Sequence, residues 1–406
     1  MSNQVPSVFE AALARGLVSR RTAMAGMAGL AGVASLAACG SAAKSPTAGA
    51  TTKGLVKAAT DLSATEKLVN WSNWPSYMDV NTTTKNHPTL DAFTKKTGIK
   101  VNYTEDYNDN NEFYAKVRPL LAAGADTGRD VWVSTDWMVA RLIRENFVQK
   151  FDLANIPNHA NVEDALLNVL YDKGRLYSLP WQSGFTGIAW NPKSTGGKKI
   201  ETVDQLLTDP KLKGKVTLLT EMHDTIGLVL IALGKDPANF TDADFDAAVA
   251  EIQKAKDAGQ IKGFTGNDYT KPLASGDTAA CMAWTGDVVQ LKADNPSLGY
   301  ALPTAGFMYW SDNFVIPNLA KHKKNAETVI NYYYDPAVMA QVVDYVNYIS
   351  PVKGSKAVLL KSDPPAAANP LIFPSSAVIA NAKIFRPLTA AEETKYNRKF
   401  QAIVTG

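Results

Sequence analysis

EKLVNW at residues 66–71 and TLDAFTKKTGIKVNY at residues 89–103 predict a strand, a helix and a second strand in succession. The helical part has apolar residues at helical spacing and ends at Gly98, a residue typical of a helix C-terminus. Residues 99–103 alternate apolar and polar side chains, which indicates a strand. DVWVS at residues 130–134 predicts a third strand, followed by a helix at about 137–145. Strands that alternate with helices predict an α/β fold with largely parallel sheets.

The same pattern continues to the C-terminus. A helix is expected from residue 112, where Pro119 must kink or shorten it. Further strands are expected at 184–191, 215–219, 279–284 and 310–317, and further helices at about 225–234, 242–258, 326–334, 337–345 and 390–404. Without residues 1–38 the chain keeps 368 of its 406 residues. That length favours two lobes over one.

SRRTAMAGMAGLAGVASLAACG at residues 19–40 predicts export. A positive n-region with the paired Arg20 and Arg21, a short apolar run and a small-residue cleavage site are typical of a signal peptide, here of the twin-arginine type. The run LAAC resembles a lipobox, so Cys39 is expected to carry lipid and anchor the protein to the membrane. An uncut membrane-spanning helix is the alternative, but the run is short and diluted by glycine. Residues 1–38 are therefore the expected signal peptide, and 39–63 a flexible tether rich in small polar residues.

Composition narrows the possible partners and chemistry. The net charge is +3, and three arginines and one glutamate in residues 1–38 account for +2 of it. The remainder is nearly neutral, which gives no argument for nucleic acid as a partner. Cys281 lies in an apolar run and is expected to be a core residue, and the four histidines lack metal-ligand spacing. No G-x-S-x-G elbow, P-loop, G-x-G-x-x-G or H-E-x-x-H motif occurs, so neither a cofactor nor a metal is expected. An extracytoplasmic hydrolase stays as the alternative from another functional class.

Aromatic residues stand beside acidic ones at the ends of the expected strands. These residues are Trp74 and Tyr77, Asp136 with Trp137, Glu221 and Asp224, Trp284 with Asp287, and Trp310 with Asp312. Ligands of open α/β sheets bind beyond the carboxyl ends of the strands. A cleft of rings and carboxylates suits an organic cation, because carboxylates pair with ammonium groups and ring faces attract the charge. The simpler interpretations are lobe packing for the rings and helix capping or turn formation for the acids.

At these residues the sequence resembles the spermidine/putrescine-binding proteins of bacterial ABC importers, from about Leu68 to Val404. The matching runs are 73–77, 93–101, 114–116, 134–135, 177–180, 220–224, 283–286 and 309–312. The resemblance implies a two-lobed periplasmic-binding fold that closes on its ligand by hinge bending, with lobe 1 at 64–183 and 309–355 and lobe 2 at 184–308 and 356–406. It also implies a monomeric receptor that does no covalent chemistry and delivers a polyamine to a membrane permease.

The resemblance implies a role for each matching residue. The aromatic box would be Trp74, Tyr77, Trp284, Trp310 and Tyr348. Ser134 would hydrogen-bond the ligand, Asp312 would hold an inner amine, and Glu221 with Asp224 would hold a terminal amine. Three positions depart from the family pattern: Pro75 replaces a polar residue, Asp136 replaces a tyrosine, and Arg386 falls near a glutamine position. Because a guanidinium in the cleft would repel a polyamine or bind a carboxylate, an amino acid, a thiamine-like cation or a metal chelate stays open as the ligand.

Overall fold

The computed structural model describes residues 58–406. The predicted signal peptide, Cys39 and most of the predicted tether lie outside these residues. The last tether residues pack on the body: the Leu62 amide donates to the carbonyl of Lys321 at 2.7 Å, and Ser63 is buried. Within residues 58–406, no helix has the length and apolarity needed to cross a membrane.

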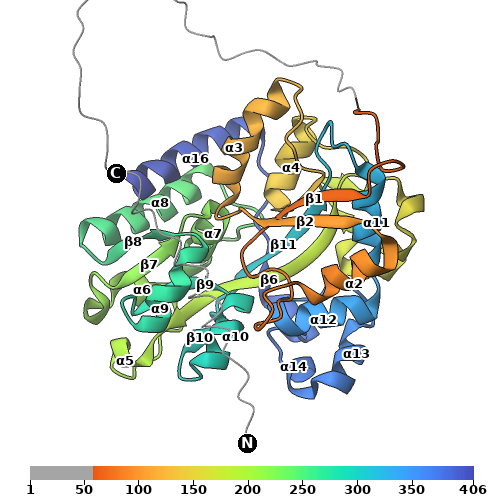
Figure 1. The fold of residues 1–406 in the computed structure, drawn as a ribbon. Coiled ribbons are helices and arrows are strands. Elements are labelled where there is room, and N and C mark those ends of the chain that lie inside the picture. The colour runs from red at the N-terminus through yellow and green to blue at the C-terminus, as the bar shows by residue number, and fades with distance from the viewer. Residues whose placement is uncertain (1–57) are drawn as a thin grey trace, which may run out of the picture.

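Strands and helices alternate along much of the described chain (Figure 1). The strands are β1 Leu68–Asn73, β2 Lys100–Glu105, β3 Val131–Thr135, β4 Asn168–Val169, β5 Asp172–Lys173, β6 Leu179–Trp190, β7 Val216–Leu219, β8 Ile261–Thr265, β9 Ala280–Trp284, β10 Gly299–Ala301, β11 Phe307–Val315 and β12 Ala382–Lys383. The helices are α2 Pro88–Thr97, α3 Asn110–Ala122, α4 Asp136–Arg144, α5 Pro192–Thr195, α6 Val203–Thr208, α7 Met222–Ala232, α8 Asp242–Asp257, α9 Thr270–Ser275, α10 Thr285–Asp294, α11 Lys323–Tyr333, α12 Pro336–Val346, α13 Ser355–Ser362, α14 Pro364–Ala368, α15 Ser376–Asn381 and α16 Ala390–Thr405.

One continuous sheet runs through the molecule in the order β2-β1-β3-β11-β6-β9-β7-β8. At each end three strands pair in parallel, as the strand–helix alternation predicts. The long strands β6 and β11 pair antiparallel with each other and with β9 and β3, respectively, and they cross the middle of the molecule from one group of elements to the other (Figure 1). The α/β prediction is confirmed, with a mixed sheet.

Two hydrophobic cores lie on either side of this crossing. The first surrounds β1, β3, α11 and α12, and the second surrounds β7, β9, α7 and α8. Both long strands contribute to both cores: Trp181 and Phe314 pack in the first, and Phe185 and Phe307 in the second. The chain therefore forms two lobes joined by two long strands.

The cores divide the C-terminal part differently from the sequence-based boundary at residue 355. Leu359, Ala367 and Ile372 are buried in the first core, whereas Phe385, Tyr396 and Phe400 are buried in the second. Residues 355–373 therefore pack with lobe 1. The proline-rich segment gave no hydrophobic period from which this could be predicted.

Local sequence explains most of the element ends. Pro88 is the first residue of α2, and Gly98 ends it at φ +73°, in the left-handed region. Helix α3 continues through Pro119 and ends three residues later, at Ala122, so the proline does not end the helix. Strand β8 and helix α10 were not predicted, because β8 is only half-buried and α10 begins with Thr285 and Gly286, which are poor helix formers. Cys281 is fully buried in β9, as predicted for a core residue.

Candidate functional site

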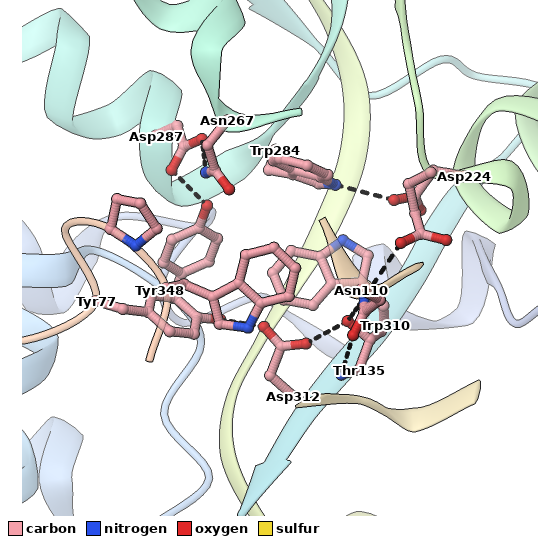
Figure 2. A pocket seen from close by; sticks show the side chains of 13 residues that line it. Tyr77, Asn110, Thr135, Asp224, Asn267, Trp284, Asp287, Trp310, Asp312 and Tyr348 are labelled. Atoms are coloured by element: carbon pink, nitrogen blue, oxygen red, sulfur yellow. Dashed lines mark hydrogen bonds between the residues drawn. The ribbon is translucent and has the colours of Figure 1, made fainter. Parts of the chain in front are cut away.

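A narrow cavity of about 40 Å³ lies between the lobes. Its lining residues come from β11, from the ends of β3 and β9, and from the segments that follow β1, β2, β7, β8, β9 and α12. They are Trp74, Pro75, Tyr77, Asn110, Thr135, Glu221, Asp224, Asn267, Trp284, Asp287, Trp310, Asp312 and Tyr348. Figure 2 shows Asp224, Asp287 and Asp312 around the rings of Trp284, Trp310 and Tyr348.

The turn after β1 places two rings in the lobe 1 wall. Ser76 adopts φ +59°, and its amide donates to Glu105 Oε1 at 3.3 Å, which fixes the turn. The Trp74 ring packs on Tyr107 with ring centroids 4.7 Å apart. The Tyr77 hydroxyl reaches across the cavity and donates to Asp312 Oδ2 at 2.8 Å.

Asp312 lies in the middle of β11, where the pairing with β6 shifts register between Asp312 and Asn313. Bulges of this kind occur beside binding sites because they re-aim a side chain. Thr135, its partner on β3, donates its hydroxyl to Asp312 Oδ1 at 2.7 Å. Burial raises the pKa of Asp312 to about 7, and the hydrogen bonds from Thr135 and Tyr77 only partly oppose the rise.

Glu221 and Asp224 lie at the N-terminus of α7 in lobe 2. Glu221 occupies the N-cap position but makes no capping bond; instead Asn110 of lobe 1 donates its amide to Glu221 Oε2 at 3.2 Å. Asp224 accepts from Thr186 Oγ1 at 2.7 Å and from Trp284 Nε1 at 2.9 Å. Burial and the neighbouring Asp109 raise the pKa of Glu221 to about 8. Burial and Glu221 raise the pKa of Asp224 to about 7.

A fourth buried carboxyl, Asp287, lies in the first turn of α10. It accepts hydrogen bonds from the hydroxyls of Tyr348 at 2.7 Å and Tyr269 at 2.8 Å, and from the Asn267 amide at 3.1 Å. Burial raises its pKa, and these three hydrogen bonds oppose the rise. The Tyr348 ring in turn contacts Tyr77 edge-on at 5.1 Å. Asp287 therefore orients the ring that closes this end of the cavity.

Two glycines make room for the rings. A Cβ on Gly286 would stand 2.3 Å from the Tyr348 ring, and a Cβ on Gly184 would stand 2.5 Å from the Trp310 ring. Both distances are far below ordinary van der Waals contact. The aromatic wall in its present position therefore requires glycine at both positions.

The cavity is lined by four carboxyl groups and, within the described chain, by no basic side chain. No lysine, arginine or histidine lines it, and across residues 58–406 no lysine or arginine forms an ion pair with any of the four carboxyls. His223 stands 3.4 Å from Glu221 Oε1, but burial lowers its pKa to about 4, so it is neutral at pH 7. Buried carboxyls without a counter-charge resist ionisation. A cation between them would restore their ionised form.

The structure brings eight of the eleven predicted ligand-binding residues to this cavity. They are Trp74, Tyr77, Glu221, Asp224, Trp284, Trp310, Asp312 and Tyr348. Pro75, one of the departures from the family pattern, also lines it.

Three predicted residues do not line this cavity. Ser134 points the other way and shares a hydrogen bond of 2.7 Å with Tyr107, which lies behind Trp74. Asp136 and Arg386 line a different cavity. The Arg386 guanidinium donates to Glu392 at 2.7 Å and stacks over the Phe240 ring, so its charge is already paired.

Four lining residues were not among the predicted ligand-binding residues, namely Asn110, Thr135, Asn267 and Asp287. Thr135 is the neighbour of the predicted Ser134, and strand alternation decides which of the two faces the cavity. Asp287 was named in the aromatic–acidic pattern at strand ends, but the family resemblance assigned it no role. The two asparagines carry no comparable signal.

The lobes contact each other around the cavity. Glu393 of α16 pairs with Arg141 Nη1 at 3.0 Å and with Arg144, both on α4. The Tyr348–Asp287 bond and the stacking of Trp137 on His223, with centroids 4.5 Å apart, bridge the same interface. The arrangement is that of lobes closed on each other.

Comparison with known proteins agrees with this architecture. The family described as bacterial extracellular solute-binding protein matches residues 89–374. A spermidine/putrescine-binding periplasmic protein of Haemophilus influenzae is 28% identical over 292 residues, 72% of this chain and 78% of its own. A putrescine-binding periplasmic protein of Escherichia coli is 29% identical over 341 residues, 80% and 87% of the two chains.

The solved structure of a spermidine/putrescine ABC transporter substrate-binding protein from Streptococcus pneumoniae superposes with a TM-score of 0.67 at 23% identity. The match covers 83% of this chain and 98% of that one, which shows a shared fold. The family matches most of the described residues, and the two lobes meet around a cleft of rings and carboxyls. The chain therefore belongs to the family of bacterial extracellular solute-binding proteins.

Proposed function

We propose that this chain is the substrate-binding component of an ABC importer and captures a polyamine, putrescine or spermidine, between its lobes. The observation that carries the proposal is the set of four buried carboxyls, Glu221, Asp224, Asp287 and Asp312, in a cavity walled by aromatic rings and free of lining cations. A linear amine fits this chemistry because its ammonium groups pair with carboxylates while its methylenes lie against ring faces. The curated relatives, named for binding these amines, support the same ligand class.

The carboxyls would divide between the ends and the middle of the ligand. Asp312 faces the centre of the cavity from β11, Glu221 and Asp224 approach from α7, and Asp287 approaches from α10. Ligand binding would replace repulsion among buried carboxyls by attraction to ammonium groups. This exchange lowers the free energy of the closed form and thereby couples capture to closure.

The N-terminal sequence completes the proposal. A twin-arginine-type signal would export the chain, and lipid on Cys39 would keep it at the membrane beside its permease. Lipid modification of one cysteine supplies the two or more acyl chains that stable anchoring needs. The protein would act as a monomer and hand its ligand to the permease without covalent chemistry.

A thermal-shift panel tests the ligand class. Purified protein, dialysed free of amines, is heated with putrescine, spermidine, spermine, arginine, glutamate and glucose in turn. We expect a rise in Tm with at least one polyamine that grows with its concentration, because a ligand that binds only the folded state stabilises it. A rise with glutamate or glucose and none with any polyamine would contradict the proposal.

A further inference from the structure

A second cavity, of about 220 Å³, lies on the other face of β11. Successive strand residues point to opposite faces, and Trp310 and Asp312 line the first cavity while Tyr309 and Ser311 line the second. The second cavity therefore lies behind the strand that carries Asp312. It is roomier than the first, and both lobes contribute to it.

The walls of this second cavity are largely apolar. Lobe 1 contributes Trp137 and Tyr171, and lobe 2 contributes Phe385 and Leu388. An engineered apolar cavity of about 150 Å³ admits benzene. A volume of about 220 Å³ therefore accommodates one aromatic ring or branched aliphatic group together with a few polar atoms.

Two opposite charges without ionic partners lie in these walls. Asp136 accepts the Trp137 amide at 2.7 Å, and in the described chain no lysine or arginine forms an ion pair with it. Arg175 is 2% exposed and likewise has no carboxylate partner there. The two other arginines of the cavity are already paired with glutamates. Asp136 and Arg175 both line this cavity, so a single ligand in it can meet both charges.

Arg175 is held rigidly, with one nitrogen left over. Its Nε donates to the carbonyl of Leu166 at 2.6 Å, and its Nη1 donates to Asn313 Oδ1 at 2.8 Å and to Ser178 Oγ at 3.1 Å. Its Nη2 has no hydrogen-bond partner in residues 58–406. Its backbone adopts φ +52°, an uncommon conformation for a residue with a side chain.

One further polar nitrogen in the same wall, Trp137 Nε1, lacks a hydrogen-bond partner within the described chain. Buried donors are nearly always hydrogen-bonded in folded proteins, to the chain itself, to water or to a ligand. Unsatisfied donors gathered around one cavity favour a ligand that brings acceptor oxygens. A carboxylate group meets that need and also matches the charge of Arg175.

We propose that this second cavity binds one zwitterion, an α-amino acid with an aromatic or branched apolar side chain. Its ammonium group pairs with Asp136, its carboxylate pairs with Arg175, and its side chain lies against the apolar walls. A monofunctional amine or acid of the same shape leaves one buried charge unpaired, which is costly. This proposal does not rest on the identity of the ligand that the first cavity binds.

An amino acid bound in the second cavity would also affect the affinity of the first cavity for its ligand. It would contact both lobes, so its affinity depends on how the lobes are arranged. Any change that it causes in the affinity of the first cavity must be matched by an equal change in its own affinity when the first cavity is occupied.

Calorimetry with three ligands of one shape tests the charge requirement on the unaltered protein. L-phenylalanine is titrated first, then phenethylamine, which lacks the carboxylate, and 3-phenylpropionate, which lacks the ammonium group. We expect one L-phenylalanine per chain and at least a tenfold weaker affinity for each of the other two. No binding of L-phenylalanine, L-leucine or L-tryptophan at 10 mM would overturn the proposal, and so would equal binding of phenethylamine and L-phenylalanine.

Substitutions then locate the amino acid. Asp136→Asn should weaken L-phenylalanine at least tenfold, whereas Asp164→Asn, at an exposed acid of the neighbouring segment, should leave it unchanged. Asp312→Asn, in the first cavity, should not weaken it, because the substitution removes no group that the amino acid contacts. Loss of L-phenylalanine binding in Asp312→Asn with retention in Asp136→Asn would place the amino acid in the first cavity and overturn the proposal. The ligand comparison stands even where a variant fails to fold, because it uses the unaltered chain.

Discussion

Replacement of Asp312 by asparagine should change stability and affinity in opposite directions. The side chain is 5% exposed and accepts hydrogen bonds from Tyr77 and Thr135. Asparagine has nearly the same shape, and its amide can still accept a hydrogen bond from one hydroxyl and donate one to the other. The substitution therefore removes a charge with little change in packing.

The raised pKa gives the expected gain in stability. Burial raises the pKa of Asp312 to about 7 from an ordinary value of 3.8, so the folded protein binds more protons than the unfolded chain between these pH values. The free energy of unfolding consequently falls as the pH rises through this window. One pH unit corresponds to about 1.4 kcal/mol, so the ionised carboxyl costs the ligand-free protein up to about 4 kcal/mol at pH 8.

An asparagine at this position carries no such cost. At pH 8 we expect the ligand-free Asp312→Asn protein to unfold with a free energy about 1–4 kcal/mol higher than that of the unaltered protein, the lower value allowing for weaker hydrogen bonds. At pH 4 the aspartate is largely protonated in the folded protein, and the two proteins should be nearly equal. Urea unfolding followed by tryptophan fluorescence at the two pH values measures both differences.

Affinity should move the other way. An ammonium group left without its carboxylate in a buried site costs about 3–5 kcal/mol. The Kd for the best polyamine should therefore rise by about 10²–10³-fold or more. Asp246→Asn is the matched control, because Asp246 is an exposed acid of α8 paired with Lys399. It should alter neither quantity appreciably. The reasoning is refuted if Asp312→Asn keeps full affinity, or if its change in stability is the same at pH 4 and pH 8.

Three further predictions concern protonation, packing and closure. At pH 6.5 polyamine binding should release protons, because ammonium groups favour the ionised forms of buried carboxyls such as Glu221, whose pKa burial raises to about 8. Calorimetry in two buffers of different ionisation enthalpy counts the released protons. An uptake of protons on binding would contradict this prediction. Gly286→Ala should lower the affinity for the polyamine at least tenfold, because the added Cβ would overlap the Tyr348 ring. Gly263→Ala is the control and should leave the affinity unchanged, because its Cβ would meet nothing within 4 Å. Glu393→Gln should weaken the interlobe contact with α4. The ligand-free protein should then show a larger radius of gyration in small-angle scattering, and the Kd for the polyamine should rise about 3–30-fold. An unchanged radius with unchanged affinity would refute the role of this contact.

The alternation of strands and helices could be predicted because it depends on local hydrophobic periods and on terminal residues such as Gly98. The rings and acids at strand ends could be predicted for the same reason: the chain places them after Asn73, Leu219 and Trp284, where strands end. The central crossing could not, because the pairing of β6 with β11 joins segments more than a hundred residues apart. That pairing joins the strands of the two lobes in one sheet.

The orientation of single side chains marks the limit of prediction for the site. Ser134 and Thr135 are adjacent, and only the register of β3 against β11 sends Thr135 to Asp312 and Ser134 to Tyr107. Asp136 lines the second cavity rather than the first for a similar reason, because α4 carries it behind β11. Such distinctions depend on long-range packing, which a single sequence does not report.

Isothermal titration of the purified, amine-free protein with putrescine and with spermidine at pH 8 tests the central claim most directly. The account predicts one ligand per chain for at least one of the two, with an affinity that falls at least a hundredfold in Asp312→Asn and is unchanged in Asp246→Asn. No binding of either amine to the folded protein, or binding that Asp312→Asn leaves intact, would contradict it.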